Sequence, residues 1–220
     1  MMMTPGQLKR ARLDRGWNQR EAAARLRVTQ AYLSMLESGR RDMTPLSRKL
    51  VKVYGLPPTA LPVEEVSEGA TADLLARELA SLGYPGFAHL RRNTRWRNPA
   101  NFLLTALLQR NLEARVAEGL PWLVMRYPDM PRDWLVREAR ARALQNRLGF
   151  VVTLSRLAGR RDDLRPLELE LADSKLAKED SFCRELNEAE RQWLRANRSQ
   201  EAKQWNLLSD MRPETVRYAL

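Results

Sequence analysis

Apolar residues recur at helical spacing along most of the chain. Near the start, Leu8 and Ala11 fit the inner face of one helix, and Leu33 and Leu36 fit that of another. Runs that alternate polar and apolar residues are few, and Ile is absent, so strands have little support. The pattern predicts an all-α protein.

Capping residues and glycines divide the first region into five short helices. Asn18, Thr29 and Thr44 are suited to begin helices, because their side chains can accept a hydrogen bond from a free backbone N–H. Gly16 and Gly39 stand where helices should end. The expected helices cover residues 4–15, 19–26, 30–38, 44–55 and 58–61.

An acidic segment, PVEEVSEGAT at residues 62–71, contains Pro and Gly and lacks helical periodicity. We therefore expect a domain at residues 1–63, a linker at 64–70 and a larger all-helical domain at 71–220. Helices in the second domain are expected near residues 71–82, 99–118, 121–127, 131–160, 166–181, 187–197 and 199–210, with a turn after Pro213. Pro121, Pro128 and Pro131 are expected to break helices.

Composition excludes several classes of function. The chain has one Cys and one His, so it can build neither an intrachain disulfide nor a zinc finger. The apolar run FLLTALL at residues 102–108 is far shorter than the roughly 20 residues that cross a bilayer, and no signal peptide opens the chain. We expect a cytoplasmic protein that uses no membrane, metal or cofactor. Phosphate-binding Gly loops and nucleophile motifs are also missing, so an enzyme is disfavoured.

Positive charge is concentrated near the start of the chain. The net charge is +11, and residues 1–62 hold twelve Lys and Arg against four Asp and Glu, a net +8. Arg outnumbers Lys 32 to 6, a bias that makes the position of the charge more informative than its amount. A basic first domain indicates a polyanionic partner.

Two of the expected helices are joined only by Arg27-Val28-Thr29, a helix-turn-helix pattern typical of DNA binding. The major groove of B-DNA, about 12 Å wide, admits one helix, which reads base edges with short or amide side chains near its N-terminus. The candidate base-reading residues are Gln30, Ala31, Tyr32, Ser34 and Met35.

Several further features of residues 6–61 coincide. They are the basic residues of the first helix, Asn18-Gln19, Ala23, Val-Thr-Gln at 28–30, Leu33, Leu36-Glu37-x-Gly39-Arg40 and Tyr54-Gly55-Leu56. With these features the segment resembles the phage-repressor-like helix-turn-helix (Xre) family. One departure is Arg27, which occupies the turn position where the family usually has a small residue.

The resemblance implies roles for individual residues. Gln30 matches a glutamine whose amide reads adenine, and Arg12 and Glu37 match a pair that joins the first helix to the end of the third. The phosphate contacts assigned in this way, together with neighbouring basic residues, are Gln19, Arg20, Thr29, Arg40 and Arg41. Taken singly, each polar residue could be merely exposed, and the Arg12–Glu37 contact could be a weak surface pair.

Together these features predict a sequence-specific double-stranded-DNA-binding transcriptional regulator, a repressor that places helix 30–38 in the major groove and binds an inverted repeat as a homodimer. The alternative is an antitoxin-type autorepressor whose C-terminal helical domain binds a partner protein. Sequence does not separate the two, since both need the same DNA-binding domain.

The second domain carries less readable signals. Its tryptophans have helical spacing and are expected in a core rather than in a ligand pocket; they are Trp96, Trp122, Trp134, Trp193 and Trp205. A basic loop could be a solvated segment or a contact surface for DNA or an acidic partner; it holds Arg91, Arg92, Arg95 and Arg97. We expect His89 at the surface and Cys183 in a structural role.

Overall fold

The computed structural model describes residues 3–91 and 96–218, and this part of the chain is mostly helical. Contacts divide the chain into two compact units, Met1–Glu64 with Trp96–Asn98 and Glu65–Arg95 with Pro99–Leu220. The expected all-α fold is confirmed, with an N-terminal helix-turn-helix arrangement followed by a larger helical unit.

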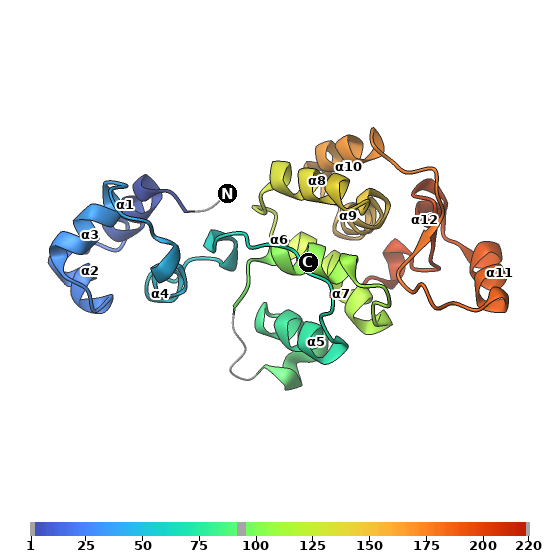
Figure 1. Ribbon diagram of the computed structural model, residues 1–220, viewed down its shortest axis with the longest axis horizontal. Coiled ribbons are helices and arrows are strands. Elements are labelled where there is room, and N and C mark those ends of the chain that lie inside the picture. Colours follow the sequence, from blue (N-terminus) through green and yellow to red (C-terminus); the bar gives the residue numbers. More distant parts are fainter. Residues whose placement is uncertain (1–2, 92–95, 219–220) are drawn as a thin grey trace. The chain divides into compact units, whose positions relative to one another are not determined.

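The first unit consists of short helices around a small apolar core (Figure 1). They are α1 (Pro5–Leu13), α2 (Gln19–Arg25), α3 (Gln30–Glu37), the 3₁₀ turn η1 (Thr44–Leu46), α4 (Ser47–Val53) and the 3₁₀ turn η2 (Pro58–Ala60). The expected caps form, since Asn18 accepts a hydrogen bond from the N–H of Glu21 and Thr29 from that of Tyr32. The expected helix 44–55 begins as a 3₁₀ turn, and the expected helix 58–61 is only such a turn.

Residues far along the sequence complete the first unit. Asn98 is 2% exposed, and its Nδ2 donates hydrogen bonds to the carbonyl oxygens of Thr59 at 3.2 Å and Leu61 at 2.7 Å. The chain thus enters the second unit after Glu64, returns to the first at Trp96–Asn98 and leaves it again at Pro99. Local periodicity gives no sign of this return.

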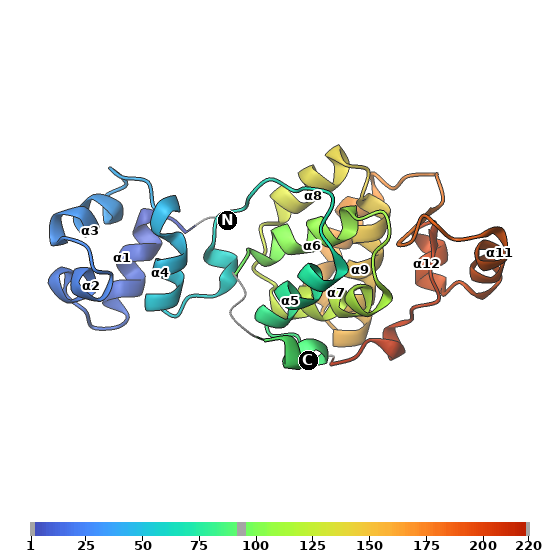
Figure 2. The ribbon, with the colours of Figure 1, turned by 60° about the horizontal axis from the view of Figure 1, so that its bottom comes forward.

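Helix α9 forms the centre of the second unit, with α6 and α7 beside it (Figure 2). All of its residues from Gln145 to Ser155 are buried. The unit's elements are α5 (Ala72–Ser81), η3 (Pro85–Leu90), α6 (Pro99–Leu108), α7 (Ala114–Arg126), α8 (Arg132–Ala141), α9 (Gln145–Gly159), η4 (Asp162–Leu164), α10 (Arg165–Ala172), β1 (Asp180–Ser181), α11 (Glu188–Asn197), α12 (Gln200–Gln204), β2 (Leu207–Leu208) and η5 (Pro213–Thr215).

The helices predicted over residues 166–181 and 199–210 end early, at Ala172 and Gln204, so the second half of each prediction is wrong. Asp180–Ser181 pairs in parallel with Leu207–Leu208 instead. Asn146 holds the segment before β1, because its side chain accepts a hydrogen bond from the N–H of Leu176 and donates one to the Leu176 carbonyl, each at 2.9 Å. Side-chain bonds to the backbone offer the chain an alternative to helix, which explains the early end of α10.

Two long expected helices are interrupted. The expected helix 131–160 is α8 and α9, separated by a turn in which Ala143 has a left-handed φ of 55°. The expected helix 99–118 ends at Leu108, because the N–H of Leu112 is drawn to the carbonyl of Phe182 at 2.8 Å. The turn at Ala143 is closed by a local bond from the N–H of Leu144 to the Ala139 carbonyl at 2.8 Å, in a residue type that gives no turn signal. The break at Leu108 comes from a tertiary contact that a local pattern does not contain.

The expected helix break at Pro121 is wrong, because this proline lies inside the continuous helix α7. Its ring leaves one backbone hydrogen bond unmade, but its own carbonyl accepts a bond from the Ser155 hydroxyl at 3.1 Å. Burial of the surrounding apolar residues against α9 keeps the helix continuous. Pro128 and Pro131 do lie at the break between α7 and α8.

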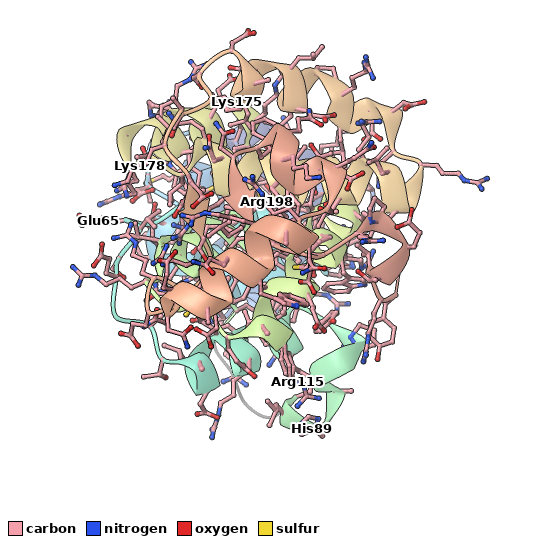
Figure 3. All side chains as sticks on the ribbon, turned by 90° about the vertical axis from the view of Figure 1, so that its right-hand side faces the viewer. Glu65, His89, Arg115, Lys175, Lys178 and Arg198 are labelled. Carbon is pink, nitrogen blue, oxygen red and sulfur yellow. The ribbon has the colours of Figure 1, made fainter. Side chains whose placement is uncertain are left out.

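The tryptophan prediction is partly right. Trp205 and Trp122 are buried and Trp134 is partly buried, whereas Trp96 is 41% exposed and Trp193 is 55% exposed. His89 lies at the surface as expected (Figure 3). In the basic loop, Arg91 donates from Nε to the Ala80 carbonyl and Arg97 is half-buried, while Arg92 and Arg95 lie outside the described residues. Within residues 3–91 and 96–218, no helix is long and apolar enough to cross a membrane.

We predict that Gly149→Ala destabilises the second unit. A Cβ at this position would lie 2.2 Å from the Trp205 ring, which is fully buried and anchored by a 2.8 Å hydrogen bond from its Nε1 to the Thr153 hydroxyl. The overpacking should lower the free energy of unfolding, measured by urea denaturation, by about 1–3 kcal/mol. A double-mutant cycle with Trp205→Leu is the control, and an equal cost of Gly149→Ala in both backgrounds would contradict the packing account.

Candidate DNA-binding site

A tight turn sets the angle between α2 and α3. Arg27 takes a left-handed φ of 47°, and the N–H of Val28 donates to the Ala23 carbonyl at 3.0 Å. A left-handed conformation costs a residue with a Cβ about 1–2 kcal/mol, a cost that glycine avoids. The Arg27 side chain points to solvent, so the family's turn forms here without the usual small residue.

One face of α3 is left open. Leu33 and Leu36 are fully buried, whereas Gln30, Ala31 and Ser34 on the opposite side are exposed. The two remaining candidate base-reading residues, Tyr32 and Met35, are half-buried at the edges of this face. The sequence prediction thus placed five residues on or beside the accessible face of the helix.

The N-terminus of α3 is suited to a phosphate. Thr29 is exposed and caps the helix, and its hydroxyl oxygen accepts the N–H of Tyr32 at 3.1 Å. The free N–H groups of the first turn and the helix dipole favour an anion at this end. The hydroxyl hydrogen of Thr29 remains available as a donor.

A buried ion pair fixes α3 to α1. Arg12 donates from Nε and Nη2 to the two carboxylate oxygens of Glu37, at 2.6 and 3.0 Å, and the two side chains are only 7% and 3% exposed. The remaining guanidinium nitrogen, Nη1, donates to the Trp17 carbonyl at 2.8 Å. The expected pair therefore forms, and it is a buried, bidentate contact rather than a weak surface one.

The same carboxylate holds Gln19. The Gln19 amide donates to Oε2 of Glu37 at 3.0 Å, which fixes the orientation of the side chain at the start of α2. Burial works against ionisation of Glu37, but the hydrogen bonds from Arg12 and Gln19 outweigh it, and the pKa of Glu37 is lowered. Among the described residues the other amide hydrogen of Gln19 has no acceptor, so the side chain keeps a donor for its predicted contact with a phosphate.

Basic residues flank the open face of α3. Arg20 on α2 is exposed, as are Arg40 and Arg41 just after α3. The N–H groups of Arg40 and Arg41 both donate to the Met35 carbonyl, at 2.9 and 3.3 Å, so the backbone that carries these two cations is held against α3. Their roles as phosphate contacts remain predictions.

Sequence reasoning missed a cluster that fixes the α1–α2 connection. The Arg25 guanidinium lies 4.4 Å from the ring centroid of Trp17, and the Trp17 ring contacts that of Tyr54 with centroids 5.4 Å apart. Arg15 adds a hydrogen bond to the Tyr54 carbonyl. These contacts link Trp17, in the connection before α2, to the last residue of the helix. The spacing of Trp17 and Arg25 in the sequence gave no recognisable signal for them.

Comparison with known families agrees with this geometry. Residues 8–61, about a quarter of the chain, match the family model described as Helix-turn-helix. The N-terminal domain is thus an Xre-type helix-turn-helix domain, of a family of DNA-binding transcription regulators rather than enzymes. No curated protein and no solved structure matches the chain. In the part of the chain that the structure describes, no three His, Cys, Asp or Glu residues gather as a metal site.

We predict that Glu37→Gln destabilises the first unit by about 3 kcal/mol at neutral pH, because it leaves the buried Arg12 cation without its counter-ion. Urea unfolding followed by Trp17 fluorescence, in a background in which the other tryptophans are replaced by Phe, measures the loss.

The same pair predicts a pH dependence. The pKa of Glu37 is lowered in the folded state, so the ionised carboxylate stabilises the fold. This contribution to the free energy of unfolding is present above the ordinary Glu pKa of about 4.3 and is lost as the pH falls through the lower pKa of the folded state. The stability of Glu37→Gln should therefore fall less steeply with acid than that of the wild type. Asp14→Asn, at an exposed position of the same unit, is the control. Parallel pH profiles of wild type and Glu37→Gln would contradict the prediction.

Proposed function

We propose that the protein is a sequence-specific transcriptional repressor that binds double-stranded DNA as a homodimer on an inverted repeat. The observation that carries the proposal is the open face of α3, whose angle is fixed from behind by the Arg12–Glu37 pair. A helix can read base edges only if it enters the groove at a defined angle, and the buried pair supplies that rigidity.

Phosphate contacts fit around this helix. Gln19 and Thr29 stand at the N-termini of α2 and α3, where backbone N–H groups also favour phosphates. Arg20, Arg40 and Arg41 add exposed cations beside them. The net charge of +8 over residues 1–62 supplies the general attraction to DNA that such contacts then orient.

Dimerisation is supported by the size of the module. A single domain of this kind buries about 600–1,000 Å² on DNA, which gives limited affinity and specificity. Two copies on half-sites about 34 Å apart double the contacts and make a palindromic operator the natural target. In this proposal the second unit contributes the contacts between copies.

An antitoxin-type autorepressor is the second candidate, and one observation favours it. Helix α11 has no buried residue and carries Trp193, which is 55% exposed. Exposed tryptophans are enriched at protein interfaces. Affinity purification from the native host with nuclease separates the two candidates: a stoichiometric partner protein supports the antitoxin type, and self-association alone supports the repressor.

We predict that Gln30→Ala and Arg40→Ala weaken DNA binding in different ways. Once selection from random duplexes has given an operator, Gln30→Ala should lower the preference for it by about 1–3 kcal/mol, because the amide reads a base. Arg40→Ala should weaken operator and scrambled duplex alike and reduce the slope of log affinity against log salt by about one contact.

Titrations on both duplexes at several salt concentrations measure these effects. Lys203→Ala, an exposed cation of the second unit, is the control for loss of charge alone. Equal losses from Gln30→Ala and Arg40→Ala on both duplexes would sink the assignment of α3 as the reading helix.

The homodimer predicts a dependence on spacing within the operator. Insertion of about half a helical turn between the half-sites rotates one site to the opposite face of the duplex, so affinity should fall to that of a single half-site. Insertion of a full turn should restore part of it. Affinity that is indifferent to both insertions would show that the two half-sites are bound independently.

A further inference from the structure

The second unit contains a cavity of about 420 Å³ that the DNA-binding proposal does not use. It lies between the α8–α9 turn, the segment that leads into β1, and Arg191 of α11. Its lining residues are Ala143, Leu176, Lys178, Glu179, Asp180, Ser181, Arg184 and Arg191. The volume falls within the range of small-molecule sites, about 300–1,000 Å³.

One wall of the cavity is held in place by side chains from behind. Asn146 on α9 bonds both backbone groups of Leu176, and Asn206 donates to the same carbonyl at 2.8 Å. The fully buried Arg147 donates to both carboxylate oxygens of Asp180, at 2.8 and 2.9 Å, and to the Ser181 carbonyl. The wall is therefore formed before any ligand arrives, which lowers the entropy lost on binding.

Both acidic residues of the lining are already neutralised. Asp180 is paired with Arg147, and Glu179 is paired with Arg195 at 2.9 Å and with Arg198 at 3.7 Å. The hydrogen bond from Arg195 also lowers the pKa of Glu179. Neither carboxylate is left to repel an anion.

Three cations of the lining, in contrast, form no direct ion pair with a carboxylate in the described part of the chain. Lys178 and Arg184 are exposed, and Lys178 lies at the surface in Figure 3. Arg191 donates from Nε to the Leu186 carbonyl at 3.2 Å and from Nη2 to the Arg184 carbonyl at 3.0 Å. Its guanidinium is thus held in position by backbone carbonyls, and its charge acts on nearby Glu179 without forming a direct ion pair.

We propose that this cavity binds a small organic phosphate. Phosphate oxygens accept hydrogen bonds well from the planar guanidinium groups of arginine and from the compact ammonium group of lysine, and the lining has two arginines and one lysine. Leu176 and Ala143 give apolar surface for the organic part, and the cavity has room for more than a bare anion. A concave site of this size favours a small ligand over a nucleic-acid backbone, which binds along open grooves.

Isothermal titration of the full chain with inorganic pyrophosphate tests the proposal. One saturable site per chain is expected, and Lys178→Glu combined with Arg184→Glu should weaken it at least tenfold. Lys203→Glu combined with Arg165→Glu makes the same change of charge at exposed positions outside the lining and should leave the affinity unchanged. Arg40→Glu combined with Arg41→Glu, which should weaken DNA binding, should also leave it unchanged.

Three outcomes would overturn the proposal. They are the absence of a saturable site for pyrophosphate at millimolar concentration, an equal loss in the control pair outside the lining, and a loss in the Arg40 and Arg41 variant, which would place the site on the DNA-binding domain. Circular dichroism and thermal unfolding of each variant show that a loss does not come from misfolding. Weakened duplex binding by Lys178→Glu with Arg184→Glu, without a pyrophosphate site, would assign the cations to nucleic acid instead.

Discussion

The buried Arg12–Glu37 pair is the contact on which the geometry of the first unit depends. The Arg12 guanidinium joins α1 to Glu37 at the end of α3 and also donates to the carbonyl of Trp17. The Glu37 carboxylate in turn orients Gln19 at the start of α2. Three helices are thus held by a single charged cluster. Because a buried charge that loses its partner is strongly destabilising, the cluster tolerates few alternatives and gives the open face of α3 a defined direction.

A second buried arginine plays a comparable part in the other unit. Arg147 is 1% exposed and donates to the carbonyls of Leu107, Gln109 and Ser181 as well as to Asp180. It therefore satisfies backbone carbonyls at the C-terminal end of α6, in the residue that follows it and in β1, which would otherwise be buried without partners. In both units an ion pair fixes irregular backbone that apolar packing alone does not specify.

Local signals predicted much of the first unit and of its candidate site. The caps at Asn18 and Thr29 and the Arg12–Glu37 pair form as expected, because capping and turn chemistry act within a few residues and the family pattern supplied the pair. The return of Asn98 to the first unit was not predictable, since it depends on carbonyls nearly forty residues away. In the second unit, the left-handed turn falls on Ala143, a residue type that gives no turn signal, and the continuous helix through Pro121 comes from long-range packing that overrides local preference.

Hydrogen exchange of the full chain, with and without an operator duplex found by selection, shows directly whether α3 lies in the DNA-binding surface. DNA should slow amide exchange in peptides covering residues 19–41, at the N-termini of α2 and α3 and the loop that follows, while the helices packed around α9 change little. Protection confined to the second unit, with residues 19–41 unchanged, would contradict this prediction and would move the DNA-binding surface away from α3.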